Sequence, residues 1–296
     1  MLHKKISLTE RHRETEVWKF IAIAVIIASV FMIYPIFYSL FISLHKTQGL
    51  KSVFIGFGNV QRLFKDTVFW KALGNNFIFL LFQVPLMLIL GLLFATLLNA
   101  RNLHFRGFFR TALFLPCVTS LVAYSVLFRM MFQLDGVVNK LLLTLHLVTS
   151  PINWLNDPFW AKILIILALC WRWTGYNMMF FIAGLQNVSG DTLEAAEIDG
   201  ANGWQKFFFI TVPQLKSVIL FTTIMSTIGT VQLFDEVVNL TGGGPANATA
   251  TASQLIYNHS FVYTSNFGYS AMMSWVLVII VAALSLIQFK VAGDKE

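Results

Sequence analysis

The densest group of titratable side chains in this 296-residue chain lies in the segment 188–213. Four carboxylates fall within nine residues there, and no basic residue follows until Lys206. They are Asp191, Glu194, Glu197 and Asp199. An anionic membrane surface would repel this segment, so a protein partner with basic or polar pockets suits it better. A solvated loop that only connects two helices is the alternative.

A second group combines aromatic and polar side chains within the apolar stretch 161–187. Trp173 and Asn177 are four residues apart, and Trp173 and Tyr176 are three apart, so a helix would place them on one face. Aromatic rings can cover the apolar face of a sugar, while amide and hydroxyl groups hydrogen-bond its hydroxyls. Packing between helices is the alternative for these aromatics, and close helix contact is the alternative for Gly175.

Charged residues in or beside the apolar stretches are candidates for function, and three of them stand out. Arg172 is near the centre of 161–187, where a charge costs about 2.5 to 3.5 kcal/mol. It should therefore face a partner or a watery cavity. Asp235 and Glu236 are possible partners, and simple exposure at the outer interface is the alternative for these two acids.

Hydroxyl side chains recur at three- and four-residue spacings in the stretch 217–234. They are Thr223, Ser226, Thr227 and Thr230, and Gln232 follows them. Polar side chains near the bilayer midplane can line a substrate path. Alternatively, such hydroxyls bond the carbonyl of the preceding turn or permit close helix packing.

The composition indicates which elements must position these residues. Hydrophobic residues make up 57% of the chain and charged residues 12%, against about 25% charged in a soluble domain. We therefore expect an all-α membrane protein. Cys117 and Cys170 both lie in apolar runs, so neither a disulfide framework nor a thiolate metal site is indicated. The net charge of +7 then concerns orientation in the membrane and does not suggest a nucleic-acid partner.

Six stretches are long and apolar enough to cross a bilayer core about 30 Å thick. They are 20–44, 72–100, 111–128, 161–187, 217–234 and 267–289. The first is too long for a signal-peptide core, so we expect it to be retained. The uncharged stretch 141–156 is interrupted by His146, Pro151, Asn153 and Asn156, which favours an interfacial or re-entrant piece.

The positions of Lys and Arg predict both termini on the cytoplasmic side of the plasma membrane. In that orientation twelve of the 21 basic residues are inside. They are Lys4, Lys5, Arg11, Arg13, Lys19, Arg101, Arg106, Arg110, Lys206, Lys216, Lys290 and Lys295. The outer loop 239–266 has none, whereas the first outer segment has five and is a contrary signal. Residues 1–19 would form a cytoplasmic segment and 20–296 the membrane domain.

The acidic segment 188–213 has the signals of two short helices. Asp191 with Glu194, and Asn202 with Gln205, fit capping boxes, and Gly200 suits a helix end between them. Pro213 would then open the fifth span.

This segment resembles a known signature. The run Glu194-Ala195-Ala196-Glu197-Ile198-Asp199-Gly200, nine residues and then Ile210-Thr211-Val212-Pro213 looks like the EAA motif of membrane subunits of ATP-binding-cassette importers. Only Val212, where Leu is usual, departs from it. The resemblance implies a coupling helix that docks on a cytoplasmic ATPase. The residues it assigns to coupling are Glu194, Ala195, Ala196, Asp199, Gly200 and Pro213.

Other runs are similar to the first permease of maltose, lactose, multiple-sugar and glycerol-phosphate importers. They are Phe114-Leu115-Pro116, Trp171-Arg172-Trp173-Thr174-Gly175-Tyr176-Asn177, Phe234-Asp235-Glu236 and Leu240-Thr241-Gly242-Gly243-Gly244-Pro245. Phe128 stands where a tryptophan is often found, and the first outer loop is shorter than in the maltose type. The resemblance places sugar contacts within 171–178 and 229–236. The implied substrate path comprises Trp171, Trp173, Thr174, Gly175, Asn177, Met178, Gly229, Thr230 and Gln232.

The resemblance also implies a set of partners for a chain that is not itself an enzyme. They are a second six-helix permease, two copies of an ATPase that binds ATP and Mg, and an extracytoplasmic sugar-binding protein facing the outer loop. No cofactor or metal is expected in this chain. A self-sufficient secondary transporter or channel is the main alternative. Within importers, Arg172 leaves a glycerol-phosphate or acidic-oligosaccharide substrate open.

Overall fold

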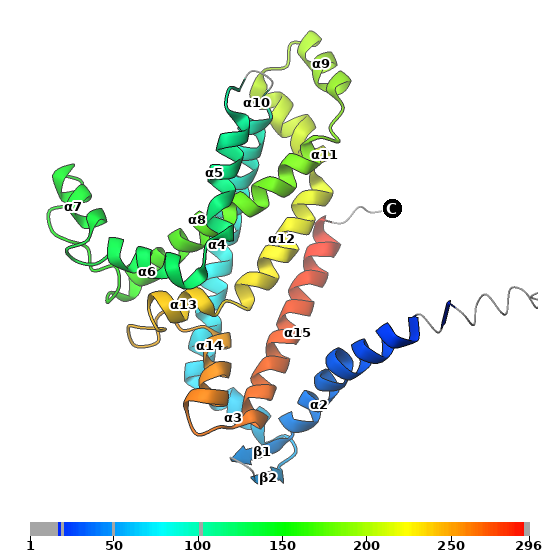
Figure 1. The fold of residues 1–296 in the computed structure, drawn as a ribbon, viewed down its shortest axis with the longest axis vertical. Coiled ribbons are helices and arrows are strands. Elements are labelled where there is room, and N and C mark those ends of the chain that lie inside the picture. The colour runs from blue at the N-terminus through cyan, green and yellow to red at the C-terminus, as the bar shows by residue number, and fades with distance from the viewer. Residues whose placement is uncertain (1–16, 19–20, 49–50, 101–102, 293–296) are drawn as a thin grey trace, which may run out of the picture. The chain divides into compact units, whose positions relative to one another are not determined.

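The computed structural model describes residues 17–18, 21–48, 51–100 and 103–292, and most of them are helical (Figure 1). Most of the expected cytoplasmic segment 1–19, with its five basic residues, lies outside these described residues. Two compact units are present: 1–63 with 259–275, and 64–258 with 276–296. Each is described by itself.

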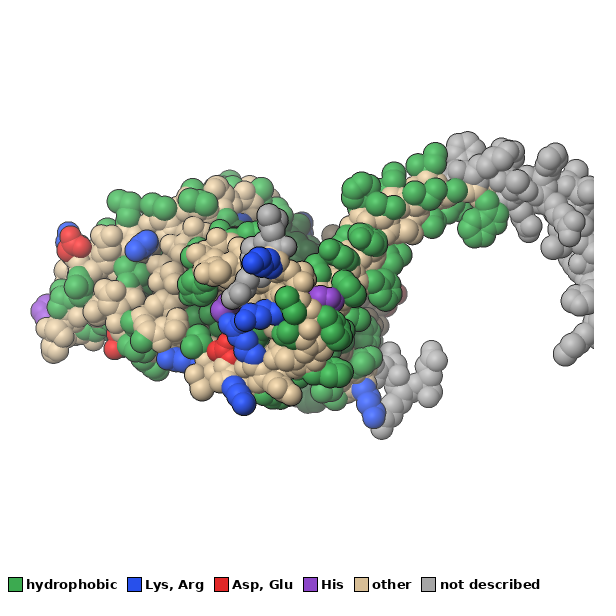
Figure 2. Space-filling view, turned by 90° about the horizontal axis from the view of Figure 1, so that it is seen from below, with side chains coloured by type: hydrophobic (Ala, Val, Ile, Leu, Met, Phe, Trp, Pro, Cys, Tyr) green, Lys and Arg blue, Asp and Glu red, His purple; other side chains and the backbone are tan. Residues whose placement is uncertain are grey.

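The first unit contains the first expected span. Residues 21–43 form a 23-residue uncharged helix, with a π-helical turn at Ser29–Ile33 before α2 (Tyr34–Ser43). Hydrophobic side chains cover this helix on the face seen in Figure 2. Its length matches the 30 Å of a bilayer core, at about 1.5 Å per residue. The expected span 20–44 is therefore confirmed as a membrane-length helix.

A short hairpin follows, which the all-α expectation did not include. Strands β1 (His45–Gln48) and β2 (Lys51–Phe54) pair antiparallel, with His45 opposite Phe54. The Asn59 amide, near the start of α3 (Gly58–Lys65), donates to the Ser43 oxygen at 2.7 Å and to the His45 oxygen at 2.9 Å. One buried side chain thus fixes where the helix ends and the hairpin begins.

The second unit is built around α4 (Thr67–Asn99) and α8 (Pro158–Leu185), which pack along each other. Both begin at an aspartate, as helix-capping chemistry predicts. Asp66 accepts hydrogen bonds from two main-chain NH groups at 3.0 and 3.1 Å, and Asp157 does so at 2.9 and 3.0 Å. These helices confirm the expected spans 72–100 and 161–187.

The third expected span, 111–128, is not one straight helix. Helices α5 (Arg106–Val118) and α6 (Leu121–Met131) meet at an angle of 97° across Thr119 and Ser120. Thr119 is extended, so its carbonyl leaves the helical pattern. That oxygen accepts a hydrogen bond from Arg172 Nη1 at 3.1 Å. The break is thus supported by a side chain from another helix.

The stretch 141–156 does not span the membrane, as expected. It contains the end of α7 (Val137–Thr144), which is too short to cross a bilayer, and then irregular backbone. The buried Asn139 side chain organises this piece: it donates to the Ile152 oxygen at 2.9 Å and accepts from Ile152 N and the Trp154 indole.

The remaining helices complete the fold. They are α9 (Gly190–Ile198), α10 (Gly203–Lys206), the π-helical Phe207–Thr211, α11 (Val212–Gln214), α12 (Lys216–Val231), α13 (Asp235–Leu240), α14 (Ala252–Tyr257), the π-helical Asn258–Val262 and α15 (Phe267–Ala292). The segment Gly203–Gln214 meets α12 at 70°. Pro213 lies before this bend, so, contrary to the prediction, it is not the residue at which the straight helix of the fifth span begins. Counting each bent pair as one span gives up to six spans within the described residues.

Candidate functional site

The predicted coupling segment, residues 188–213, begins with an exposed pair of short helices at one end of the second unit, where α9 and α10 are labelled in Figure 1. No residue of α9 is buried. Glu194, Ala195 and Asp199 are exposed, Ala196 is half-buried, and Ile198 is 87% exposed. The structure therefore places five of the six predicted coupling residues together on α9 and the turn after it, whereas Pro213 lies apart from them in α11.

Gly200 ends α9 in the way its sequence position predicts. Its φ of +82° is in the left-handed region that favours glycine. The NH of Gly200 donates to the Glu197 oxygen at 3.1 Å, and the NH of Ala201 donates to the Ala196 oxygen at 2.9 Å. This is the Schellman arrangement, and it turns the chain sharply into the next helix.

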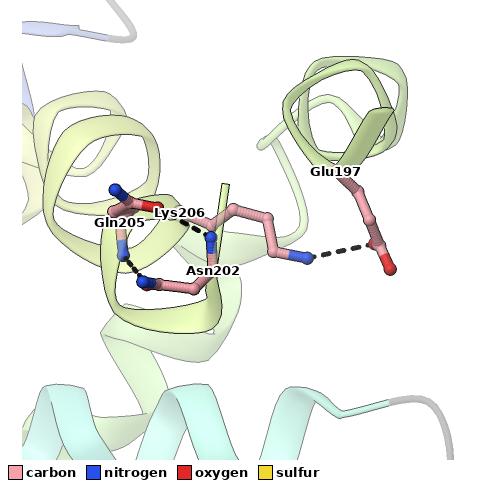
Figure 3. Close-up of polar contacts among 4 residues, drawn as sticks. All are labelled: Glu197, Asn202, Gln205 and Lys206. Atoms are coloured by element: carbon pink, nitrogen blue, oxygen red, sulfur yellow. Dashed lines mark hydrogen bonds and ion pairs between the residues drawn. The ribbon is translucent and has the colours of Figure 1, made fainter. Parts of the chain in front are cut away.

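The second helix is capped as predicted, and an ion pair joins it to the first (Figure 3). Asn202 Oδ1 accepts from Gln205 N at 2.9 Å, and Gln205 Oε1 accepts from Asn202 N at 2.8 Å. Lys206 Nζ lies 3.0 Å from Glu197 Oε2. The two helices are thus linked both through the Gly200 turn and through side chains.

The capping box predicted at Asp191 and Glu194 is wrong. Ser189 occupies the N-cap position and makes no side-chain capping bond, and Asp191 lies inside the first turn. A negative charge at that position still interacts favourably with the helix dipole.

A cavity of about 360 Å³ in the second unit gathers several of the predicted substrate-path residues. Its wall is formed by α4, α8, α12, the segment that follows α12, and Leu121 at the start of α6. The predicted residues that line it are Trp173, Asn177, Gly229, Thr230, Gln232, Asp235 and Glu236. They combine one aromatic side chain, two amides, a hydroxyl and two carboxyls. An aromatic side chain can cover the apolar face of a sugar, and the polar groups can hydrogen-bond its hydroxyls.

Hydrogen bonds hold the polar wall residues in place. Asn177 Nδ2 donates to the Trp173 oxygen at 3.0 Å, and Asn177 Oδ1 accepts from Ser226 Oγ at 3.4 Å. The Thr230 hydroxyl lies 2.8 Å from both Gln83 Oε1 and the Ser226 carbonyl oxygen. Thr223, in contrast, donates to the Ile219 oxygen of the preceding turn and lies outside this cavity. Ser226 and Thr230 thus line the cavity, whereas Thr223 and Thr230 bond the carbonyl of the preceding turn.

Sequence reasoning missed the contribution of α4. Gln83 and Met87 line the cavity, and Gln83 is buried. An uncharged amide in the middle of a 33-residue apolar helix was the available signal, since a polar group in that position needs a partner. Gln83 belongs to none of the runs that resemble other permeases.

Four predicted substrate-path residues do not line the cavity. Trp171 packs against the Phe128 ring, with centroids 5.3 Å apart. Met178 and Thr174 are buried in the helix packing. A Cβ on Gly175 would overlap the Leu113 main-chain oxygen, so this glycine allows α5 to approach α8 closely. The alternative of helix packing holds for these positions.

Arg172 is buried next to the cavity wall. Its guanidinium lies over the Tyr124 ring at 4.8 Å and the Trp173 ring at 5.3 Å from their centroids. Within the described residues no ion pair of 4.0 Å or less joins it to Asp235 or Glu236. The observed partners of the Arg172 charge are thus the Thr119 carbonyl oxygen and two aromatic rings, not one of the two acids considered from the sequence.

The two acids differ in environment. Asp235 is exposed, whereas Glu236 is 5% exposed and its Oε1 accepts a hydrogen bond from the Trp173 indole at 3.4 Å. Glu236 belongs to α13, outside the membrane-length helices, and its burial raises the pKa of its carboxyl. The nearby charge of Arg172 acts in the opposite direction. The outer-interface exposure considered for both acids holds only for Asp235.

The predicted outer loop, 239–266, is hydrogen-bonded within itself and to α4. Gln254 Nε2 donates to the Gly242 oxygen at 2.9 Å. Asn75 donates to the oxygens of Asn247 and Ala250 at 3.0 and 2.9 Å. The glycine-rich run 242–245 therefore lies in a loop that is tied to α4.

Comparisons with known proteins show the family of the chain. Residues 55–291 match the family described as binding-protein-dependent transport system inner membrane component. The chain is 53% identical to the lactose transport system permease protein LacF of Rhizobium radiobacter, over 98% of each chain. It is 35% identical to the arabinooligosaccharides permease AraP of Bacillus subtilis, over 90% of this chain and 84% of that one. It is 32% identical to the sulfoquinovosyl glycerol permease SmoG of Agrobacterium fabrum, over 93% and 90%.

Solved structures share the fold. A chain of a bacterial alginate ABC transporter, in complex with an alginate pentasaccharide-bound periplasmic protein, superposes with a TM-score of 0.82 at 19% identity. The match covers 96% of each chain. Since the family description covers most of the chain and relatives above 30% identity span nearly all of it, the chain belongs to the family of binding-protein-dependent transport system inner membrane components.

Proposed function

We propose that this chain is the transmembrane permease subunit of an ABC importer for a sugar or oligosaccharide. It lines half of the translocation path and couples that path to a separate ATPase. The observation that carries this proposal is the continuity of two helices. Both α8 and α12 have residues in the cavity wall, and the coupling segment connects the end of α8 to the start of α12. A movement of α9 would therefore reach the cavity through two rigid helices.

The substrate class follows from the cavity wall and from the relatives. Trp173 offers an apolar ring, and Asn177 and Thr230 offer hydrogen-bonding groups beside it. The relatives named for lactose, arabinooligosaccharides and sulfoquinovosyl glycerol all carry glycosides. A sugar or short oligosaccharide is thus the proposed cargo.

The partners follow from the exposed surfaces. The acidic helix α9 is suited to basic pockets of an ATPase, which would bind the ATP and Mg that drive transport. A second six-helix permease would complete the path, and an extracytoplasmic sugar-binding protein would dock on the outer loop. The chain itself would bind no cofactor and catalyse no reaction. Both termini would lie in the cytoplasm of a cell whose inner membrane holds the complex.

Co-purification and transport test this proposal together. Affinity purification through a tag on this chain should recover a second permease and two copies of an ATPase. Proteoliposomes holding that complex, with the binding protein outside and ATP inside, should accumulate a labelled sugar. A chain that purifies alone and moves sugar without ATP would be a secondary transporter or channel and would refute the proposal.

A further inference from the structure

The charges around the cavity are distributed unevenly. Asp235 and Glu236 both line it, whereas the described residues of its wall include no Lys, Arg or His. The buried Arg172 does not line the cavity. Its guanidinium is held by the Thr119 oxygen and by the Tyr124 and Trp173 rings. A bound molecule would therefore meet two carboxyls directly, and the positive charge only across the Trp173 ring.

Glu236 is fixed as part of this wall. It is 5% exposed, and its Oε1 accepts the hydrogen bond from the Trp173 indole at 3.4 Å. A carboxylate in this position can accept hydrogen bonds from sugar hydroxyls. In its ionised form it would repel an anion: at an effective dielectric constant of about 20, two like charges about 5 Å apart weaken binding by roughly a hundredfold or more.

We propose that this cavity selects uncharged sugars and that Glu236 is the residue that excludes anionic ones. This inference rests on the proposed function, because it names the substrate class of the same cavity. The fold does not decide the matter, since a solved transporter with the same fold is described as importing the acidic polysaccharide alginate. The inference rests instead on the side chains of this chain: Glu236 lines the cavity and Arg172 does not.

The test compares a neutral and an anionic probe on the purified complex of permeases and ATPases, without the binding protein. The probes are labelled lactose and the derivative whose galactose hydroxymethyl group is oxidised to a carboxylate. By equilibrium dialysis, the wild-type complex should bind lactose at least about tenfold more tightly than the carboxylate derivative. Glu236→Gln should bring the two dissociation constants within about threefold of each other, whereas Glu236→Asp should keep the discrimination.

Asp135→Asn is the matched control, since Asp135 is an exposed acid that does not line the cavity. This control should leave the ratio of the two constants unchanged. Equal binding of both probes by the wild type, no lactose binding, or an unchanged ratio in Glu236→Gln would each overturn the inference. The ratio is insensitive to partial loss of folded complex in a variant. Uptake of sugar by the reconstituted complex tests the proposed function separately. If the complex imports sugar but gives one of the overturning binding results, only the assignment of Glu236 is refuted.

Discussion

The Asn76 side chain of α4 donates a hydrogen bond to the main-chain oxygen of Thr230 at 3.1 Å, at the end of α12 that lines the cavity. The same amide donates to the Val231 oxygen at 3.0 Å and accepts from Ala252 N at 3.0 Å. One buried residue thus holds together α4, the end of α12 and the start of α14. Docking of a partner on the outer loop would reach the cavity wall through this contact.

Replacing this residue should therefore affect both stability and coupling. Asn76→Ala leaves buried carbonyl and NH groups unpaired, each at a cost of about 1–3 kcal/mol. We expect a lower melting temperature of the purified complex and weaker stimulation of ATP hydrolysis by the binding protein. Asn156→Ala, at an exposed position, is the control and should change neither. An unaltered melting temperature in Asn76→Ala would show that this junction does not stabilise the fold.

The coupling helix offers a second prediction. Glu194→Lys reverses the charge of an exposed residue on α9, so the subunit should still insert in the membrane. Transport should be abolished, because the basic or polar pocket proposed on the ATPase would face a like charge. Membrane content of the chain and uptake of labelled sugar are the two measurements. Glu194→Asp keeps the charge and should retain most uptake, and normal uptake in Glu194→Lys would exclude a coupling role.

Two glycines in the same segment form a matched pair. Gly200 has a φ of +82°, whereas Gly203 lies inside α10 and a Cβ there meets nothing within 4 Å. Gly200→Ala should cost about 1–2 kcal/mol, because a side chain disfavours left-handed backbone. Gly203→Ala should be neutral or slightly stabilising. Proteolysis rates of the segment and the ratio of sugar transported to ATP hydrolysed should both change in Gly200→Ala only; equal behaviour of the two variants would contradict the turn's role.

The positions of the apolar helices and of the two short helices α9 and α10 were predictable because their signals are local. Uncharged runs of about 20 residues have to be buried in lipid or protein, and this places a helix within a few residues of its true ends. The end of α9 depends on Gly200, which can adopt the left-handed backbone that the turn needs. Its start was misjudged by two residues because Ser189 and Asp191 are both good N-cap residues, and the helix begins after Ser189.

The break in the third span and the α4 side of the cavity depend on contacts between distant residues. Thr119 and Ser120 are not strong helix breakers, and the break is supported by a hydrogen bond from Arg172, 53 residues away. Gln83 meets Thr230 across 147 residues of sequence. Residue spacing predicts which side chains share one face of a helix, but it does not predict which other helix packs against that face. The α8 and α12 residues of the cavity could therefore be predicted, and the α4 residues could not.

A direct test of the cavity wall is Asn177→Ala. The side chain bonds the Trp173 oxygen and Ser226 and is 3% exposed, so its loss removes one polar group from the wall while α8 keeps its own main-chain bonds. We expect KM for sugar uptake to rise about tenfold, equivalent to about 1.4 kcal/mol, with the complex still assembled. Unchanged KM and maximal rate would remove Asn177 from the substrate path.

The resemblance places two glycines, Gly175 and Gly229, in the substrate path. Substituting them should have different effects, on helix packing in the first case and on sugar transport in the second. A Cβ at Gly175 would overlap the Leu113 oxygen of α5, whereas a Cβ at Gly229 meets nothing within 4 Å and would project from a residue that lines the cavity. Gly175→Ala should force α5 away from α8, at a cost of about 1–3 kcal/mol, and lower both the melting temperature and the yield of complex. Gly229→Ala should leave the melting temperature within about one degree and change KM for the sugar, because it only narrows the cavity. Melting and uptake measured on both variants decide this, and a normal yield of the Gly175→Ala complex would show that the close approach of α5 and α8 is not required.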